Sequence, residues 1–176
     1  MTKLKMGIIG AGGIAQGRHI PAYKKLSDIM TITAVSDLNP ATAAGVAKEH
    51  AIPHVFSDYQ DMFDVVDAVT ICTPNKFHAE ISIAALNAGV HVFCEKPMAM
   101  TVTECKAMID ASRKSGKLLG IAYHYRFMKD SIAAKRVITE NEIGAPIVQR
   151  VRAIRRRNVP GWGVFPNREL QRGGSL

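Results

Sequence analysis

Short apolar runs alternate with longer amphipathic segments along the first two thirds of the chain. The short runs are rich in β-branched and other apolar residues and predict strands at 5–10, 32–37, 68–73, 90–95 and 117–123. The segments between them carry apolar residues at helical spacing and predict helices over 13–26, 40–50, 75–89 and 101–116. Strands that alternate with helices form a parallel sheet covered on both faces, so we predict an α/β fold. Ligands bind such sheets at the carboxyl ends of the strands.

Residues at the ends of the predicted helices support these boundaries. Pro40 suits the first position of a helix, and Gly89 and Gly116 suit the left-handed position just after one. Thr101 or Thr103 is the expected N-cap of the last helix, and the sequence leaves the choice open.

A glycine-rich stretch, GIIGAGGIA (residues 7–15), begins within the first predicted strand and runs past its end. Gly10, Gly12 and Ala15 match the pattern G-x-G-x-x-A, with Gly13 and Ile14 between them. The first glycine permits a tight turn, the second lets a pyrophosphate approach the backbone, and the small third residue lets helix and strand pack closely. Alone the pattern is also that of a plain glycine-rich turn. Its place at the first strand-helix junction favours dinucleotide binding.

The second predicted strand ends at Asp37, in the sequence AVSDLNP. An acidic side chain at this point of a dinucleotide-binding fold accepts hydrogen bonds from the ribose hydroxyls and repels a 2′-phosphate. No arginine follows at once to hold a phosphate, so NAD is predicted as the cofactor in preference to NADP. The alternative is that Asp37 caps the helix that starts at Pro40.

The positive charge of the chain is concentrated in its last third. Of its 176 residues, 1–122 hold 12 Lys or Arg against 11 Asp or Glu, whereas 123–176 hold 11 against 4. With 47% hydrophobic residues the chain can bury one good core, and it is slightly long for a single domain. We therefore predict a dinucleotide-binding domain over 1–122 and the start of a second domain over 123–176. The basic segment at 150–157 matches no nucleic-acid-binding module, so nucleic acid is not an expected partner. Val148, Val151 and Ala153 partly alternate with arginines, which predicts instead a strand with one solvent-exposed face within 145–157.

The sequence also bears on location and on metal chemistry. No run of about 18 apolar residues occurs, and the N-terminal stretch reaches glycine too soon for a signal peptide, so we expect a cytoplasmic protein without membrane contact. Cys72, Cys94 and Cys105 have no C-x-x-C spacing. We expect them to be small apolar residues, with neither a disulfide framework nor a metal site.

Two further strand ends carry more specific motifs. One is TPNKFH, residues 73–78, and the other is EKP, residues 95–97. Together with the glycine pattern, in this order and spacing, they resemble the Gfo/Idh/MocA family of NAD(P)-dependent sugar and polyol oxidoreductases. The resemblance extends through GIAYHYRF to the end of the chain. It implies a Rossmann fold, a doubly wound parallel sheet, and hydride transfer between a sugar or polyol hydroxyl carbon and NAD.

The resemblance also implies roles for individual residues. Lys96 is the implied catalytic residue, which reaches the nicotinamide and the substrate, orients the reacting hydroxyl and shares in its proton transfer. Glu95 supports the site, and Pro97 fixes the turn, with a cis bond as one option. A solvated lysine in a loop is the plain alternative for Lys96. The residues implied along the cofactor are Gly10, Gly12, Gly13, Ile14, Ala15, Asp37, Thr73, Pro74, Asn75, His78, Glu95, Lys96 and Arg126.

Two of these positions have equally plain alternatives. Asn75 suits a helix N-cap, and His78 suits the first turn of a helix. Arg126 follows His124 and Tyr125, for which packing explains the residue types as well as ligand contact does.

The resemblance further implies a longer protein. Relatives complete the catalytic set with an aspartate and a histidine beyond a glycine cluster like that at 173–174, where Arg172 departs from the usual triplet. We therefore expect the nucleotide-binding half of a dehydrogenase, followed by the first helix and strand of an incomplete α+β domain. Such a chain is expected to bind NAD and to be inactive alone on sugars. A non-catalytic NAD-binding sensor or interaction protein is the alternative, and association into a homo-oligomer stays open.

Overall fold

A computed structural model describes residues 2–152 and 167–171 of the chain. The chain divides into two units, one made of Met1–Ala122 with Trp162–Leu176 and the other of Tyr123–Gly161. The basic segment predicted as part of a strand lies outside the described residues from position 153 onward.

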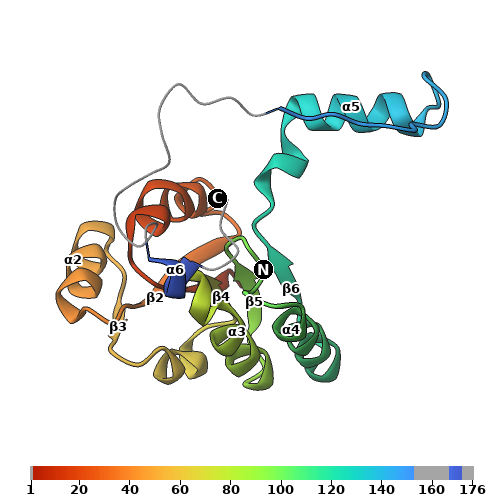
Figure 1. Cartoon of the computed structure of the whole chain (residues 1–176). Coiled ribbons are helices and arrows are strands. Elements are labelled where there is room, and N and C mark those ends of the chain that lie inside the picture. The colour runs from red at the N-terminus through yellow and green to blue at the C-terminus, as the bar shows by residue number, and fades with distance from the viewer. Residues whose placement is uncertain (1, 153–166, 172–176) are drawn as a thin grey trace. The chain divides into compact units, whose positions relative to one another are not determined.

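A six-stranded sheet forms the first unit (Figure 1). Its strand order is β3-β2-β1-β4-β5-β6, so the direction of chain progression reverses between β1 and β4. Each pairing is parallel, which confirms the predicted fold class. The strands are β1 (Leu4–Ile9), β2 (Met30–Ser36), β3 (His54–Phe56), β4 (Ala68–Ile71), β5 (His91–Cys94) and β6 (Leu119–Ile121).

Apolar cores lie on both faces of this sheet. Ile9 of β1 belongs to one core cluster, together with Ile81 and Ala111 from two helices. Its neighbour Ile8 belongs to a second cluster with Val46. Successive strand residues point to opposite faces, so the sheet is doubly wound. The helices of the first unit are η1 (Ala15–His19), with π-helical hydrogen bonding, α1 (Ile20–Lys24), α2 (Pro40–His50), η2 (Tyr59–Val65), η3 (Asn75–Phe77), α3 (His78–Asn87), α4 (Val102–Ser115) and α6 (Arg168–Gln171).

The sequence pattern missed the strand β3 and the 3₁₀ helix η2 that follows it. β3 has three residues at the edge of the sheet, where His54 and Val55 are exposed, so no apolar run marks it. Gly7 of β1 makes room for η2, because a Cβ there would lie 2.8 Å from Met62 Sδ. A glycine inside a strand marks such a close approach.

The helix ends follow the predicted chemistry. Pro40 occupies the first turn of α2, and Gly89 and Gly116 have φ values of +82° and +68°. Thr101 caps α4: its hydroxyl accepts a hydrogen bond from the Glu104 amide at 3.2 Å, and the Glu104 carboxylate accepts one from the Thr101 amide at 2.8 Å. This capping box settles the choice between the two threonines.

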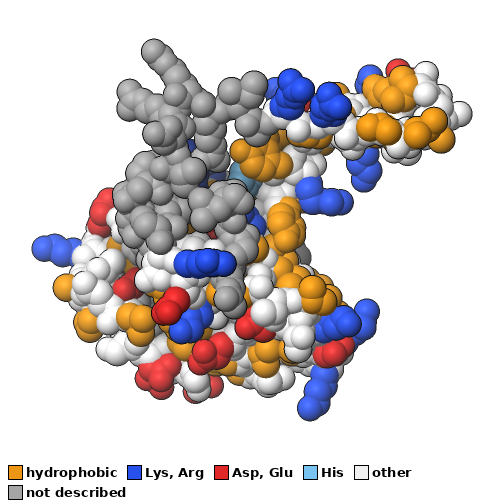
Figure 2. Space-filling model, in the orientation of Figure 1, with side chains coloured by type: hydrophobic (Ala, Val, Ile, Leu, Met, Phe, Trp, Pro, Cys, Tyr) orange, Lys and Arg blue, Asp and Glu red, His pale blue; other side chains and the backbone are white. Residues whose placement is uncertain are grey.

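The second unit contains η4 (His124–Phe127) and α5 (Lys129–Thr139). Hydrophobic side chains lie exposed along α5 among Lys and Arg (Figure 2), and Ile147 beyond it is 96% exposed. Residues 145–152 form no strand, although they belong to the segment predicted to form one. A strand needs a neighbour for its hydrogen bonds, and the described part of this unit offers none. Among the helices that the structure describes, none has the length and apolarity needed to cross a membrane.

Candidate functional site

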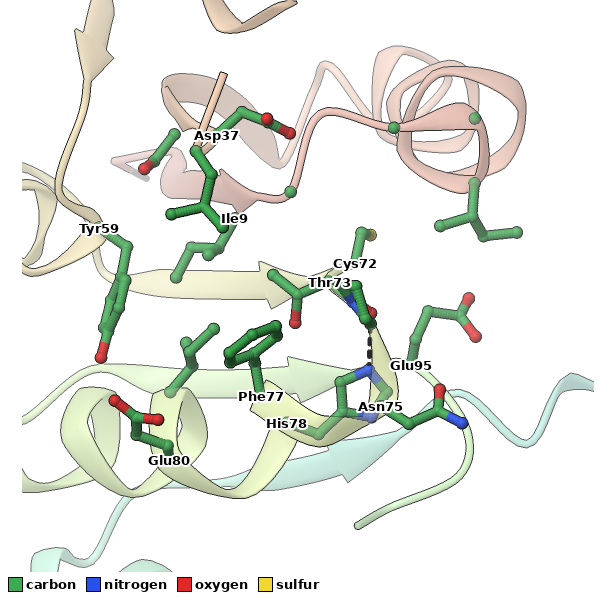
Figure 3. A pocket seen from close by; sticks show the side chains of 18 of the residues that line it. Ile9, Asp37, Tyr59, Cys72, Thr73, Asn75, Phe77, His78, Glu80 and Glu95 are labelled. Carbon is green, nitrogen blue, oxygen red and sulfur yellow. Dashed lines mark hydrogen bonds between the residues drawn. The ribbon is translucent and has the colours of Figure 1, made fainter. Parts of the chain in front are cut away.

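A cavity of about 920 Å³ opens where β1, β2, β4 and β5 end. This is the point at which the strand order reverses, the usual place for a ligand in such sheets. Asp37 and Tyr59 lie toward one end of the cavity, and Asn75 and Glu95 lie toward the other (Figure 3). The cavity brings together these predicted site residues: Gly10, Gly12, Gly13, Ile14, Asp37, Thr73, Pro74, Asn75, His78, Glu95 and Lys96.

Two predicted site residues are not among those that line the cavity. Ala15 is fully buried in the same core cluster as Ile20. A small buried residue allows the close packing of helix on strand that the third position of the glycine pattern requires. Arg126 is an exposed residue of η4, in the second unit, so its contact with a cofactor stays a prediction.

The glycine turn is tight at its start and open beyond it. Gly10 has a φ of +88°, and a Cβ there would lie 2.8 Å from the carbonyl carbon of Cys72 and 2.9 Å from the amide nitrogen of Thr73. Only glycine fits at this position without strain. Around Gly12 and Gly13, by contrast, an added Cβ would meet no atom within 4 Å. The turn therefore presents open backbone to the cavity, as a pyrophosphate requires.

The carboxylate of Asp37 is held by the backbone through both of its oxygens. Oδ2 accepts a hydrogen bond from the Ala11 amide at 2.8 Å, and Oδ1 accepts one from the Asn39 amide at 2.9 Å. The N-cap of α2 is Asn39, whose Oδ1 accepts a bond from the Ala41 amide at 3.0 Å. The alternative role of Asp37 as the helix cap is therefore wrong. Asp37 ties the glycine turn to the end of β2 and lines the cavity.

Two buried polar groups in the segment that joins β4 to α3 have no hydrogen-bond partner among the described residues. They are the hydroxyl of Thr73 and the side-chain amide nitrogen of Asn75. An unpaired buried polar group is unfavourable by about 1–3 kcal/mol, so a water molecule or a ligand group is the expected partner. Both residues line the cavity, and their groups fit a polar ligand such as a dinucleotide. Neither η3 nor α3 has a side-chain cap, so the alternative role of Asn75 as an N-cap is wrong.

The ring of His78 is fully buried at the start of α3. Its Nε2 lies 3.0 Å from the carbonyl oxygen of Thr73 (Figure 3), and its Nδ1 lies 2.7 Å from the carbonyl oxygen of Pro97. His78 thus links the turn after β4 to the turn after β5. Its polar atoms face the protein, while the residue forms part of the cavity wall.

The turn after β5 brings Glu95 and Lys96 to the cavity. Glu95 Oε1 lies 2.8 Å from His19 Nε2, and Oε2 accepts a hydrogen bond from the Lys96 amide at 3.0 Å. The peptide bond between Lys96 and Pro97 is cis. Burial by itself raises the pKa of Glu95, but the hydrogen bonds from His19 and the Lys96 amide, with the positive charges of both residues, hold the pKa below its usual value.

Sequence reasoning missed two features of this site. One is an apolar part of the wall, formed by Tyr59, Phe77 and Ile81. Phe77 lies inside the TPNKFH motif, among polar residues that suit cofactor contact more obviously. The other is His19, which is 8% exposed. It follows the buried Ala15 by four positions, so its place on the buried side of the helix was a signal in the sequence.

The reversal of strand order at a glycine turn, an acidic residue after β2 and a cavity with unpaired polar groups define a dinucleotide-binding Rossmann fold. Residues 4–123 match the family model described as "Oxidoreductase family, NAD-binding Rossmann fold", Gfo/Idh/MocA. The chain belongs to this family, which confirms the resemblance read from its motifs.

Individual relatives are named as sugar and polyol dehydrogenases. The chain is 42% identical to D-glucoside 3-dehydrogenase of Escherichia coli (strain K12), covering 99% of this chain and 50% of that protein. It is 37% identical to inositol 2-dehydrogenase of Klebsiella pneumoniae subsp. pneumoniae, covering 84% and 44%. The WlbA dehydrogenase from Bordetella pertussis, solved in complex with NADH and UDP-GlcNAcA, aligns with a TM-score of 0.77 at 27% identity, covering 81% and 44%. The chain spans about half the length of the curated relatives it matches.

Proposed function

We propose that this chain is the nucleotide-binding part of a NAD-dependent dehydrogenase, which transfers a hydride between a sugar or polyol hydroxyl carbon and the cofactor. The observation that carries the proposal is that the glycine turn, Asp37 and Lys96 line the same cavity. The names of the relatives, D-glucoside 3-dehydrogenase and inositol 2-dehydrogenase, support the substrate class. NAD, when bound, supplies the hydride acceptor at its nicotinamide ring.

Each part of the cavity has a proposed place in cofactor binding. The open glycine turn receives the pyrophosphate, and the fixed carboxylate of Asp37 accepts hydrogen bonds from the ribose hydroxyls. Tyr59 and Phe77 offer apolar surface to the adenine base. Thr73 and Asn75 offer their unpaired polar groups to the rest of the cofactor. Together these groups account for both the apolar and the polar surface of a dinucleotide.

Lys96 is the proposed catalytic residue. Its ammonium group orients the reacting hydroxyl and shares in moving its proton, and its place in the cavity wall supports that role. Arg126 keeps its proposed contact with cofactor or substrate.

Asp37 is proposed to select NAD over NADP. A carboxylate and a phosphate about 4 Å apart repel by about 1–4 kcal/mol, depending on how far solvent screens them, which corresponds to about fivefold or more in affinity. Calorimetric titration of the chain with NADH and NADPH measures this preference. We expect NADH to bind more tightly, Asp37→Asn to narrow the gap, and Asp28→Asn, an exposed aspartate outside the cavity, to leave it unchanged.

This titration tests the selection of NAD by Asp37 and the binding of a nucleotide in the cavity separately. Equal affinities for NADH and NADPH in the unchanged chain would refute the selection by Asp37. No binding of either nucleotide would refute the site itself.

A further inference from the structure

Lys96 lies between two residues that are each bonded to a different buried histidine. Before it, Glu95 Oε1 lies 2.8 Å from His19 Nε2. After it, the carbonyl oxygen of Pro97 lies 2.7 Å from His78 Nδ1. His19 is 8% exposed and His78 is 0% exposed. The residues directly before and after Lys96 are therefore both fixed by contacts with a buried histidine.

Lys96 itself provides no such anchor. The residue is exposed, and its ammonium group has no hydrogen bond or ion pair among the described residues. A lysine side chain has four methylene carbons joined by rotatable bonds. The part of the cavity that its ammonium group reaches therefore depends on where the backbone places its Cα. The bonds at Glu95 and Pro97 set that place.

The ring of His19 is fixed by its own surroundings. Its centroid lies 5.9 Å from that of Phe93, at a near-perpendicular 70°, and 6.0 Å from that of Tyr23. The Tyr23 hydroxyl is hydrogen-bonded to the hydroxyl of Thr70. His19 therefore meets Glu95 as a rigid donor that joins the helix after the glycine turn to the turn that carries Lys96.

The ring of His78 joins two cavity turns in a similar way. Its second nitrogen, Nε2, lies 3.0 Å from the carbonyl oxygen of Thr73, at the end of β4. Carbonyl oxygens only accept hydrogen bonds, so each contact needs a hydrogen on the ring nitrogen concerned. The contact with Pro97 requires that hydrogen on Nδ1.

We propose that His19 and His78 are positioning residues for Lys96. They hold the Glu95–Pro97 turn through the residues before and after Lys96, so that the lysine meets the nicotinamide end of the cofactor. The inference rests on the proposed function, in which Lys96 works at that end. It predicts that both histidines affect the nicotinamide half of NADH binding and that His19 leaves the adenosine half unchanged.

The test uses two readouts on the whole chain. Calorimetry compares NADH with ADP-ribose, which lacks the nicotinamide. Mass spectrometry follows acetylation of Lys96 by an amine-reactive ester with and without NADH. In the unchanged chain we expect NADH to bind more tightly than ADP-ribose and to protect Lys96. If it does neither, the proposed role of Lys96 fails, whatever the histidine variants do.

Replacing a histidine by asparagine or by glutamine distinguishes the role of one ring nitrogen from that of the other. The amide of asparagine lies where Nδ1 of histidine lies, and the amide of glutamine lies where Nε2 lies. His78 contacts Pro97 through Nδ1, so His78→Asn should preserve the preference for NADH and His78→Gln should lose it. His19 contacts Glu95 through Nε2, so the order should reverse, with His19→Gln preserving the preference and His19→Asn losing it.

The expected loss of NADH preference is about threefold to tenfold for each non-matching variant, the scale of one net hydrogen bond. ADP-ribose affinity should stay unchanged in the two His19 variants, because His19 is not among the residues that line the cavity. His54→Gln, at an exposed histidine outside the cavity, is the control and should behave as the unchanged chain. If the histidines had a purely structural role, the loss of NADH preference would depend on side-chain volume and not on which ring nitrogen is replaced. Equal losses for the Asn and Gln variants at either position would therefore overturn the inference.

Two measurements remain decisive where a variant does not fold. Glu95→Ala removes the same His19–Glu95 bond as His19→Asn and should reproduce its loss of NADH preference. The ring ¹⁵N–¹H spectrum of the unchanged chain shows whether His78 carries a hydrogen on Nδ1. A His78 ring with a hydrogen only on Nε2 would contradict its bond to Pro97.

Discussion

Replacing Gly10 by alanine should cost far more stability than any other glycine substitution in the cavity turn. Gly10 has a φ of +88°, a region in which a side chain costs about 1–2 kcal/mol. The added Cβ would also lie 2.8–2.9 Å from backbone atoms of Cys72 and Thr73, which belong to the next strand end and cannot rotate away. Overpacking of this kind costs typically about 1–3 kcal/mol. The expected loss in the free energy of unfolding is therefore about 2–5 kcal/mol.

Two other glycines are the matched controls for this experiment. Gly45 lies inside α2 with no atom within 4 Å of an added Cβ, so Gly45→Ala should stabilise the chain by up to about 1 kcal/mol through helix propensity. Gly12 is equally open but lines the cavity. Gly12→Ala should leave stability within about 0.5 kcal/mol of the unchanged chain. It should weaken NADH binding about tenfold or more, because the methyl group occupies pyrophosphate space.

Urea unfolding followed by circular dichroism, with calorimetric titration of NADH, measures both effects. The reasoning fails if Gly10→Ala unfolds at the same urea concentration as the unchanged chain. It also fails if Gly10→Ala and Gly12→Ala lose stability equally, since Gly10 differs from Gly12 both in its positive φ and in its close backbone contacts.

Two further predictions concern the Lys96 turn and the helix that follows it. The folded-state pKa of Glu95 lies below its unfolded value, so its interactions stabilise the protein above the unfolded-state pKa and lose this effect as the pH falls through the folded-state pKa. Glu95→Gln should therefore be less stable than the unchanged chain at pH 7 and approach it in acid; a difference that grows on acidification would contradict this. Thr101→Ala should cost about 0.5–2 kcal/mol by removing the cap of α4, whereas Thr103→Ala, within the helix, should be nearly neutral in the same urea assay. Equal losses would show that the capping box is not formed.

Features with a local cause could be predicted from the sequence. Gly10 and Pro40 mark a tight turn and a helix start, because backbone geometry restricts which residues fit there. The alternation of apolar runs and helical segments likewise identified the parallel sheet. β3 could not be predicted, since three residues on an exposed edge need no apolar pattern.

Contacts between motifs could not be predicted in the same way. His19 and Glu95 are 76 positions apart, and their pairing depends on which strands are neighbours in the sheet. The choice of Asn39 over Asp37 as the cap of α2 also depended on a distant group, because the Ala11 amide accounts for one Asp37 oxygen. Residue type and spacing suited either residue for that role.

The strand-order reversal explains why these long-range contacts gather at one place. In the sheet, β2, β1, β4 and β5 are neighbours in that order. The turns that follow these four strands therefore lie next to one another around one cavity. A turn at one strand end can therefore be held by a side chain from another. Gly10 packs against the backbone of Cys72 and Thr73, after β4. The Asp37 carboxylate accepts a hydrogen bond from the Ala11 amide, after β1, and the His78 ring contacts the Pro97 carbonyl oxygen, after β5. Each turn is fixed by its neighbour, so a substitution that displaces one should be felt in ligand binding at the next.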